Sequence, residues 1–247
     1  MNQQKMYNNL AYLYDKIYSY KDYAGEVKFV TSLVSKLNHN DQIKVIDLAC
    51  GTGKHLNEYI KFGYQVTGLD LNDGMLEIAK KNNPGADFIK GDLSDLKLDY
   101  SYDLISCLFN SIQYITSINK LTKSLVEIYK HLNNKGVFVF DLGYARDNWK
   151  EGYSLISSYR DNNTQIAMMA QSRSEDEISK WEPIIFSKIN GVLDMNIDKH
   201  EIRLYSVKEM RKILIDIGFK VKIFKNFSTT IYSVGKSNGI PVFIATK

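Results

Sequence analysis

Asp47, Asp70 and Asp92 each stand at the end of a short apolar run of the chain, or just after one. The carboxyl ends of parallel strands meet at one edge of an open α/β sheet, and ligands bind there. A carboxylate in the place of Asp70 can reach both hydroxyls of a ribose. The alternative for Asp70 is structural: an acid favoured by the dipole of the following helix. Three such acids on successive strands favour a ligand-binding edge.

The first of these acids opens a glycine loop, Asp47-Leu48-Ala49-Cys50-Gly51-Thr52-Gly53. Glycines permit positive φ and let a ligand approach bare backbone. A phosphate-binding P-loop would need Ser or Thr after Gly53-Lys54, where His55 stands, and a Gly in place of Leu48. The dinucleotide fingerprint G-x-G-x-x-G/A also fails, because its third position falls on Lys54 or Leu56. The remaining alternatives are a different nucleotide-type ligand and a turn that serves only helix–strand packing.

Alternating elements are expected to position these residues. The expected strands are Ile43–Ala49, Gln65–Asp70, Ala86–Lys90, Tyr102–Phe109 and Val137–Leu142. Helical periodicity separates them, as in the stripe Leu121, Leu125, Ile128 and Leu132. The strand 102–109 is apolar throughout, as a parallel strand buried on both faces should be. Alternation of strand and helix over 142 residues predicts an α/β fold with a doubly wound parallel sheet.

Two further segments flank this core. Tyr7, Leu10, Tyr14, Ile17 and Tyr18 share one face at helical spacing, and a second helix is expected over 25–38. The tyrosines either pack on the core or line the mouth of a pocket.

Helical periodicity is lost after Gly143. The runs Ser154–Arg160, Thr164–Ser172, Ile178–Lys188 and Ile197–Leu204 predict an antiparallel β insert that buries one face of the core or covers the substrate. A capping box, Ser206 to Glu209, then opens a helix that ends at Gly218. The final strands are expected at Phe219–Phe227 and Ile240–Thr246. These features divide the chain into an N-terminal helical arm (1–40), a core (41–142), the insert (143–203) and a C-terminal helix with the final hairpin (204–247).

Composition narrows the class of protein. The chain has 247 residues, is 44% hydrophobic and carries a net charge of +4 that is spread along its length, so nucleic acid is not an expected partner. Cys50 and Cys107 lie in apolar runs and are expected to be buried free thiols, without a disulfide or metal cluster. The segment Met1–Met6 lacks the apolar core of a signal peptide, and no apolar run reaches the length of a membrane span. We therefore expect a soluble cytoplasmic protein.

Four stretches together resemble the class I S-adenosylmethionine (SAM) dependent methyltransferases, and more narrowly the N,N-dimethyltransferases of nucleotide-linked amino sugars. They are Tyr14-Asp15-Lys16-Ile17-Tyr18 with Lys21-Asp22-Tyr23-Ala24, the loop from Asp47 to Leu56, Leu108-Phe109-Asn110-Ser111-Ile112-Gln113-Tyr114, and His200 with Leu204-Tyr205-Ser206. The resemblance covers essentially the whole chain. It implies a Rossmann-like, seven-stranded, mostly parallel sheet whose last hairpin holds the one antiparallel strand, with the β insert acting as a substrate lid.

The resemblance also implies a cofactor site for SAM, which leaves as S-adenosylhomocysteine. Backbone at Ala49, Gly51 and Gly53 would lie against its methionine part, while Asp70 would bind the ribose and Asp92 the adenine amino group. The apolar side chains implied around the adenine ring are Leu71, Met75 and Leu93. Tyr14 or Tyr23 would close over the cofactor from the arm. Phe109 and Asn110 would sit near the sulfonium.

Methyl transfer from a sulfonium is an in-line displacement, in which holding the reactants in line supplies most of the acceleration. An amine nucleophile must arrive neutral, so a weak base is useful. Tyr18, Tyr114 and His200 are the candidates for that base. The sequence therefore predicts methylation of a small molecule, at an amine nitrogen first. A homodimer through the insert is a further expectation.

Other functions remain open at this point. The same fold methylates oxygen or carbon, and a SAM-binding protein without catalysis is another possibility. The Asn/Asp-Pro-Pro-aromatic signature of nucleic-acid and glutamine methylators is absent, because Ser111-Ile112 follows Asn110. In the amino-sugar enzymes an aromatic-rich stretch follows strand five, whereas this chain has Gly143-Tyr144-Ala145-Arg146-Asp147-Asn148-Trp149.

Overall fold

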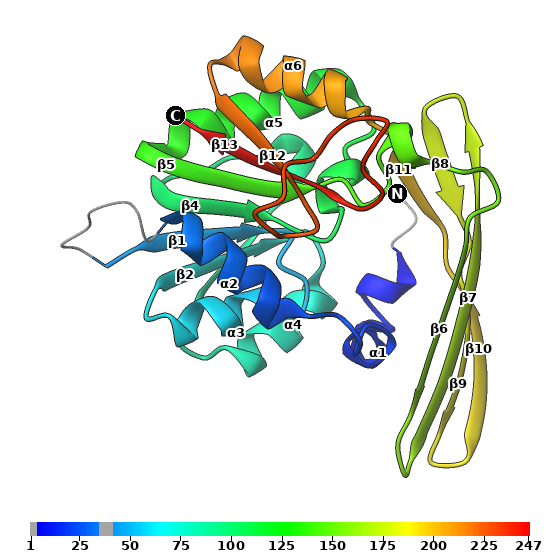
Figure 1. Cartoon of the computed structure of the whole chain (residues 1–247). Coiled ribbons are helices and arrows are strands. Elements are labelled where there is room, and N and C mark those ends of the chain that lie inside the picture. Colours follow the sequence, from blue (N-terminus) through cyan, green and yellow to red (C-terminus); the bar gives the residue numbers. More distant parts are fainter. Residues whose placement is uncertain (1–3, 35–41) are drawn as a thin grey trace.

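The computed structural model describes residues 4–34 and 42–247 of the chain. Within these residues seven strands form one sheet, in the order β12-β13-β5-β4-β1-β2-β3 (Figure 1). Their bounds are Lys44–Leu48 (β1), Gln65–Asp70 (β2), Asp87–Lys90 (β3), Tyr102–Cys107 (β4), Leu132–Asp141 (β5), Lys220–Lys225 (β12) and Pro241–Thr246 (β13). Every pair of neighbours is parallel except the two that involve β13. The expected mostly parallel sheet is confirmed, with β13 as its antiparallel strand.

Helices cover both faces of this sheet. Their bounds are Ala11–Ile17 (α1), Tyr23–Val34 (α2), Lys54–Lys61 (α3), Asp73–Asn82 (α4), Ile118–His131 (α5) and Val207–Ile217 (α6). Short 3₁₀ helices add Lys5–Tyr7 (η1), Leu93–Asp95 (η2), Ser111–Tyr114 (η3) and Arg146–Asn148 (η4).

The two faces are separated by the alternation of side chains along each strand. In β5, Val137 and Val139 pack on the side of α2 and α3. Phe138 and Phe140 point to the other side, where α5 and α6 lie. The Ser206–Glu209 capping box at the start of α6 forms as expected, and α6 ends at Gly218. Cys50 and Cys107 are buried free thiols, as predicted.

The insert forms a second, antiparallel sheet that stands beside the core (Figure 1). Its strands are Ser154–Arg160 (β6), Thr164–Glu175 (β7), Ile178–Trp181 (β8), Ile184–Ile189 (β9), Val192–Ile197 (β10) and His200–Arg203 (β11). The expected antiparallel insert is confirmed. The run Ile178–Lys188 holds two strands: Pro183 has no N–H for a ladder, and on its two sides β8 and β9 pair with different halves of β7. The run Ile197–Leu204 is likewise divided at Asp198-Lys199, between β10 and β11.

Several other boundaries of helices and strands differ from the expected ones, and three of these differences have a clear cause. β5 begins at Leu132, five residues early, because Leu132 pairs with Tyr102 before a register shift. The helical face expected over 7–18 is interrupted, since the chain turns at Asn8 between η1 and α1. α2 begins at Tyr23, and positions 35–38 of the expected helix lie outside the described residues.

The N-terminal arm, η1 with α1, lies between the core and the insert (Figure 1). Its buried Met6, Leu13 and Ile17 pack against Ile166 and Met168 of the insert. The arm therefore joins the second sheet to the rest of the molecule. Among the described residues, no helix is both long and apolar enough to cross a membrane.

Candidate active site

The glycine loop between β1 and α3 has an open backbone at one position. Ala49, Gly51 and Gly53 all have positive φ, at 56°, 56° and 78°. A Cβ added to Gly51 would meet no atom within 4 Å, whereas one added to Gly53 would lie 2.4 Å from the side-chain nitrogen of Asn83. Gly53 thus serves the packing of α3 against α4. Gly51 presents bare backbone to open space, as a ligand-binding loop requires.

Asp70, at the end of β2, is tied to this loop. Its Oδ2 accepts from the N–H of Gly51 at 2.9 Å, and its Oδ1 accepts from the backbone N–H of Asn72 at 2.9 Å and from the Asn72 side chain at 3.3 Å. Burial raises the pKa of Asp70 above its ordinary value, against these hydrogen bonds. Both oxygens of Asp70 already accept hydrogen bonds in this structure. Acceptance from two ribose hydroxyls would require the Asn72 side chain to move.

Asn72 is the N-cap residue of α4, but its side chain makes no capping bond. Besides donating to Asp70, it accepts from the side chain of Asn8 at 3.1 Å. The N-terminal arm therefore reaches the acid at the end of β2 through a chain of two amides.

Asp92 lies two residues beyond β3 and caps η2, with Oδ1 accepting from the N–H of Ser94 at 2.7 Å. Nearby apolar side chains differ in exposure: Leu71 is half exposed, while Met75 and Leu93 are buried. Leu71 consequently offers the most surface to a flat ring, and Met75 offers almost none.

Two contacts tie the arm to the glycine loop. Asp15 of α1 accepts from the Thr52 hydroxyl at 2.5 Å, and its other oxygen lies 3.2 Å from the Lys54 ammonium. At the start of α2, Glu26 contacts Nε2 of His55 at 2.8 Å. The ring of Tyr23 packs edge-on against His55, with centroids 4.9 Å apart.

A strained turn follows β4. Phe109 and Asn110 are consecutive left-handed residues, with φ of 61° and 64°, a conformation that costs energy for residues other than glycine. Asp141, at the end of β5, holds both: its two oxygens accept from the N–H of Phe109 at 2.7 Å and from that of Asn110 at 3.1 Å. The Lys21 ammonium lies 4.4 Å from the centre of the Phe109 ring.

Tyr114 and His200, two of the three base candidates, are brought together. Tyr114 Oη lies 3.0 Å from Nδ1 of His200 and 2.7 Å from Oη of Tyr7. The carboxylate of Asp198 lies 3.3 Å from Nε2 of His200. Trp181 stacks on the imidazole, with ring centroids 4.3 Å apart. These side chains come from η1, η3, β8 and the segment at the start of β11.

Tyr18, the third candidate, lies apart from that group. Its hydroxyl contacts the sulfur of Met6 at 3.9 Å, and its ring packs edge-on against Phe109. Tyr14 packs between Tyr18 and Tyr7, at centroid distances of 4.8 and 5.9 Å. Tyr14 therefore packs next to the base candidate Tyr18, whereas Tyr23 packs against His55 at the glycine loop.

An aromatic pocket adjoins these residues. It is lined by Tyr144, Trp149, Tyr153, Leu155, Ala170, Ser172, Ser179, Trp181 and Ile202. The segment 143–149, where the sequence departs from the amino-sugar enzymes, thus supplies two of its aromatic rings. Gln113, fully buried, connects this wall to the core by donating to the carbonyls of Tyr144 and Arg203, both at 3.0 Å.

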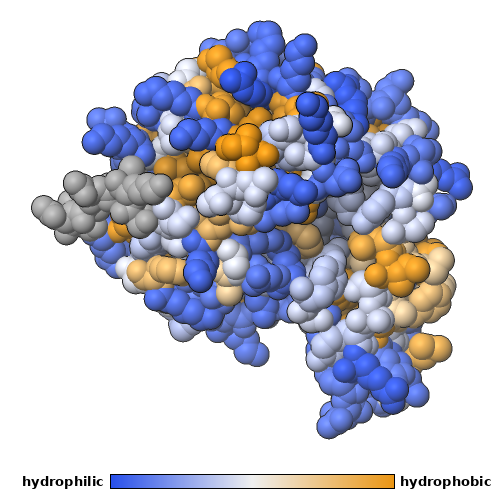
Figure 2. Space-filling model, viewed as in Figure 1, coloured by the Kyte–Doolittle hydropathy of each residue, from blue (hydrophilic) through white to orange (hydrophobic). Residues whose placement is uncertain are grey.

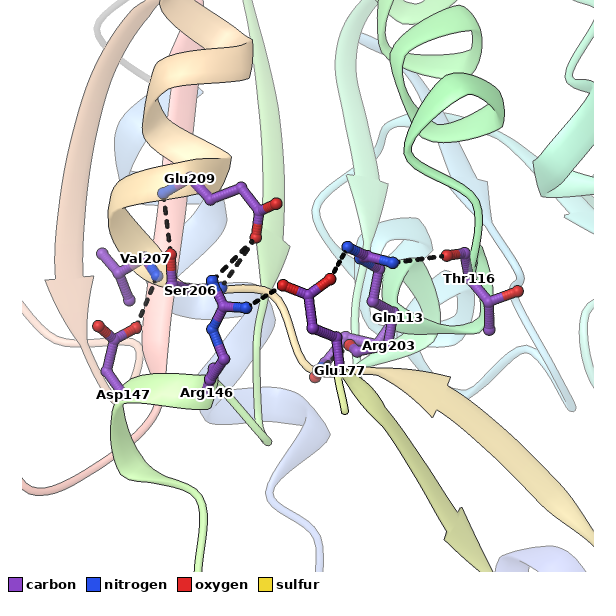
Figure 3. A network of polar contacts seen from close by, with 9 residues as sticks. All are labelled: Gln113, Thr116, Arg146, Asp147, Glu177, Arg203, Ser206, Val207 and Glu209. Carbon is purple, nitrogen blue, oxygen red and sulfur yellow. Dashed lines mark hydrogen bonds and ion pairs between the residues drawn. The ribbon is translucent and has the colours of Figure 1, made fainter. Parts of the chain in front are cut away.

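A polar network joins the insert to the core (Figure 3). Glu177, in the turn between β7 and β8, bridges the guanidinium groups of Arg146 and Arg203. Arg146 also lies 3.6 Å from Glu209 of the α6 capping box, and Arg203 donates to the carbonyl of Thr116. The network joins the insert to η4, α6 and the loop before α5.

Several of these residues were not singled out from the sequence. Asp141 stands at a strand end like the other acids, and this position is a signal that could have identified it. From the sequence, Tyr7 is only one of the arm's tyrosines that could line a pocket. Asp198 and Trp181 carry no sequence signal, because only the fold brings the insert next to Tyr114.

The comparisons with known proteins find methyltransferases. Residues 45–136 match a family model described as a methyltransferase domain. The chain is 27% identical over 218 residues to a dTDP-3-amino-3,6-dideoxy-alpha-D-glucopyranose N,N-dimethyltransferase of Streptomyces fradiae, covering 86% of this chain and 84% of the relative.

Solved structures extend the likeness to the whole fold. DesVI of Streptomyces venezuelae is 25% identical, with a TM-score of 0.82 and coverage of 95% of this chain and 97% of that one. SAM-bound CalS10, described as an amino pentose methyltransferase from Micromonospora echinaspora, superposes with a TM-score of 0.77 at 20% identity, covering 92% of each chain. Residues 45–136 of the chain thus form a methyltransferase domain, and over most of its length the chain is similar to amino-sugar N,N-dimethyltransferases.

Proposed function

We propose that the chain methylates the amine nitrogen of a small molecule, and that this molecule is an amino sugar linked to a nucleotide. The observation that carries the proposal is the arrangement at one sheet edge, where an open glycine loop and Asp70 lie beside a chamber of phenols and an imidazole. The relatives named as amino-sugar N,N-dimethyltransferases support the acceptor class.

The residues present fit SAM. Gly51 offers open backbone, and the carboxylate of Asp70 lies beside it. Asp92 and the half-exposed Leu71 have the chemistry to receive an amino group and a flat ring, with Met75 and Leu93 behind them. Ala49 and Gly53 shape the loop, and Phe109 and Asn110 form the wall that Asp141 holds. When bound, SAM supplies a methyl group on a sulfonium, which needs no acid to leave.

The arm and the insert enclose the reaction site. Tyr14 packs against Tyr7, Tyr23 packs against His55, and Asp15 ties α1 to the glycine loop. Exclusion of water and fixed orientation of the amine are the contributions that this enclosure makes. Tyr18, Tyr114 and His200 are the groups proposed to receive or guide the amine proton.

The aromatic pocket supports a ring-bearing acceptor. It combines the apolar and aromatic surface of Tyr144, Trp149 and Trp181 with the hydroxyls of two serines, the composition usual for small-molecule sites. Methylation of oxygen or carbon remains the second candidate, because the same cofactor site serves it.

The test is direct assay of methyl transfer by mass spectrometry. The purified protein is incubated with SAM and a panel of TDP-linked sugars that carry an amine or, as matched controls, a hydroxyl at the same carbon. The proposal expects one or two methyl groups on the amino sugars and none on the hydroxyl analogues. Methylation of the hydroxyl analogues alone would transfer the assignment to oxygen.

The insert is also proposed as the contact of a homodimer. Its outer strand β10 has one unpaired edge, and hydrophobic side chains gather on this part of the surface (Figure 2). The exposed residues are Ile156, Met169, Phe186, Val192, Leu193, Met195 and Ile197. Exposed apolar patches of this kind mark interaction sites. Light scattering should give a dimer mass that Leu193→Asp reduces to the monomer; a wild-type monomer at assay concentration would contradict the proposal.

A further inference from the structure

We propose that His200 is the final acceptor of the proton that the substrate amine loses, that the phenols of Tyr7 and Tyr114 carry the proton to it, and that Asp198 is its positioning residue. This inference rests on the proposed amine methylation. It adds Tyr7 and Asp198 to the site and orders the four side chains into one route.

The contacts form an unbroken series. Tyr7 Oη and Tyr114 Oη are 2.7 Å apart, and Tyr114 Oη is 3.0 Å from Nδ1 of His200. Nε2 of His200 lies 3.3 Å from Oδ2 of Asp198 and has no hydrogen-bond partner among the described residues. One nitrogen of this imidazole can receive a proton from the Tyr114 hydroxyl, while the carboxylate of Asp198 beside the other nitrogen stabilises the positive charge that results.

Burial gives the series a direction. The two phenols are partly exposed, whereas His200 is 1% and Asp198 5% exposed. Of these groups the phenols, and not the imidazole, are therefore the ones that we propose the substrate approaches. The titratable groups that face His200 are Tyr114 from η3, Tyr7 from η1 and Asp198 from its own segment, while Trp181 of β8 covers the ring face.

The phenols cannot act as the base themselves. Burial raises the pKa of Tyr7 and of Tyr114 well above the ordinary value, so both stay protonated at neutral pH. A protonated phenol can still pass a proton on, by accepting one while donating its own. The proton must then end on the imidazole.

The transfer is balanced in atoms and charge. The N–H bond of the substrate ammonium breaks and its proton goes to Tyr7 Oη, while the Tyr7 proton moves to Tyr114 and the Tyr114 proton to Nδ1 of His200. The amine keeps its electron pair and becomes neutral, and His200 becomes an imidazolium. After the product leaves, the same shifts in reverse pass the proton from His200 through Tyr114 and Tyr7 to water and restore the neutral imidazole.

Asp198 is held where it can stabilise that imidazolium. Oδ2 accepts from the N–H of Met6 at 2.7 Å, and Oδ1 accepts from the N–H of Lys199 at 2.9 Å. Burial raises the pKa of Asp198, but the contacts with His200 and the Met6 N–H outweigh it and leave the pKa below its ordinary value. The carboxylate therefore stays ionised beside the ring.

The kinetic test uses Tyr114→Phe and Asp198→Asn, with Tyr232→Phe as the matched control. Tyr232 is a buried phenol that accepts from Asn148 at 2.7 Å. We expect Tyr114→Phe to lower kcat roughly a hundredfold at neutral pH, the usual size of a proton-transfer contribution. Above the pKa of the acceptor amine, where solvent has already removed the proton, its kcat should return toward the wild-type value. Asp198→Asn should show the same rescue, and Tyr232→Phe no loss.

A purely structural role would not produce that rescue. Equal losses at every pH, or no loss in Tyr114→Phe at neutral pH, would overturn the relay. If the wild-type protein methylates no amine, the proposed function fails instead, which is a different result.

A second test needs neither cofactor nor activity. In ¹⁵N-histidine NMR spectra of the cofactor-free protein, neutral His200 should carry its proton on Nε2, because Nδ1 accepts from Tyr114. Tyr114→Phe should shift the Nδ1 signal of His200 and leave those of His55 and His131 in place. A wild-type His200 with its proton on Nδ1 would overturn the proposal.

Discussion

Asp141 shows how one buried carboxylate can define a site. It holds the left-handed turn of Phe109 and Asn110 through both oxygens, and it is 2% exposed. Burial raises its pKa from the ordinary 3.8 to about 6, although Lys21 and the two N–H groups act in the opposite direction. Asp141 thus holds the backbone beside the proposed sulfonium position, but its ionised form lowers the stability of the folded protein.

The first prediction concerns the pH dependence of the unfolding free energy that Asp141 causes. Because the folded state has the higher pKa, the contribution of Asp141 to stability is complete below about pH 3.8 and is lost as the pH rises through about 6. Relative to Asp141→Asn, the wild-type protein should therefore lose up to about 3 kcal/mol of unfolding free energy between pH 4 and pH 7. Urea unfolding of both proteins at a series of pH values measures this. A constant difference would contradict the account.

Most site residues could be predicted from the sequence where strand ends and loop spacing determine them. Asp70, Asp92 and the glycine loop depend only on the order of strands and helices, so their shared edge follows from local pattern. The sequence pattern does not predict that Tyr114 lies close to Tyr7 and Asp198. Their proximity depends on how the arm and the insert pack, and the periodicity of a sequence does not reveal such packing.

Among the elements, α1 of the N-terminal arm contacts both the glycine loop and the insert. Asp15 fastens α1 to the glycine loop through Thr52 and Lys54, while Lys16, the next residue, fastens it to Asp161 of the insert at 2.6 Å. Two adjacent side chains thus connect one short helix to two different sheets.

The second prediction separates these connections. Asp15→Ala should weaken SAM binding about tenfold, since it removes a hydrogen bond and an ion pair that hold the arm over the loop. Lys16→Met is the matched control and should leave the dissociation constant for SAM unchanged. Calorimetric titration measures both. Equal effects of the two changes would show that the arm does not act through the loop.

The boundaries of the elements were predictable to different degrees. β2 and β6 begin and end where the pattern places them, because turn residues bound both runs. The division of the run Ile178–Lys188 at Pro183 does not follow from its alternation, and only the pairing with β7 shows it.

For the whole molecule, the position of the insert relative to the core determines the shape of the aromatic pocket, where we propose that the acceptor binds. Glu177 bridges Arg146 and Arg203 at this junction (Figure 3). The participating side chains are partly exposed, so the network contributes at most about 1 kcal/mol per pair. Its main effect is on orientation.

The third prediction uses neighbouring glutamates of that junction. Glu177→Gln should raise the KM for the acceptor several-fold and speed hydrogen exchange in β8 and β11, with SAM affinity unchanged. Glu175→Gln removes only an ion pair with Lys180 at the exposed end of β7 and should change neither. A loss of SAM affinity in Glu177→Gln would contradict the assigned role.

The central claim is that the glycine loop and Asp70 bind SAM. Its most direct test is calorimetric titration of the wild-type protein and of Asp70→Ala with SAM, with NADH as the control ligand. We predict SAM binding with a dissociation constant on the order of micromolar, its loss in Asp70→Ala and no binding of NADH. Absence of SAM binding to the wild-type protein, or preference for NADH, would contradict the account.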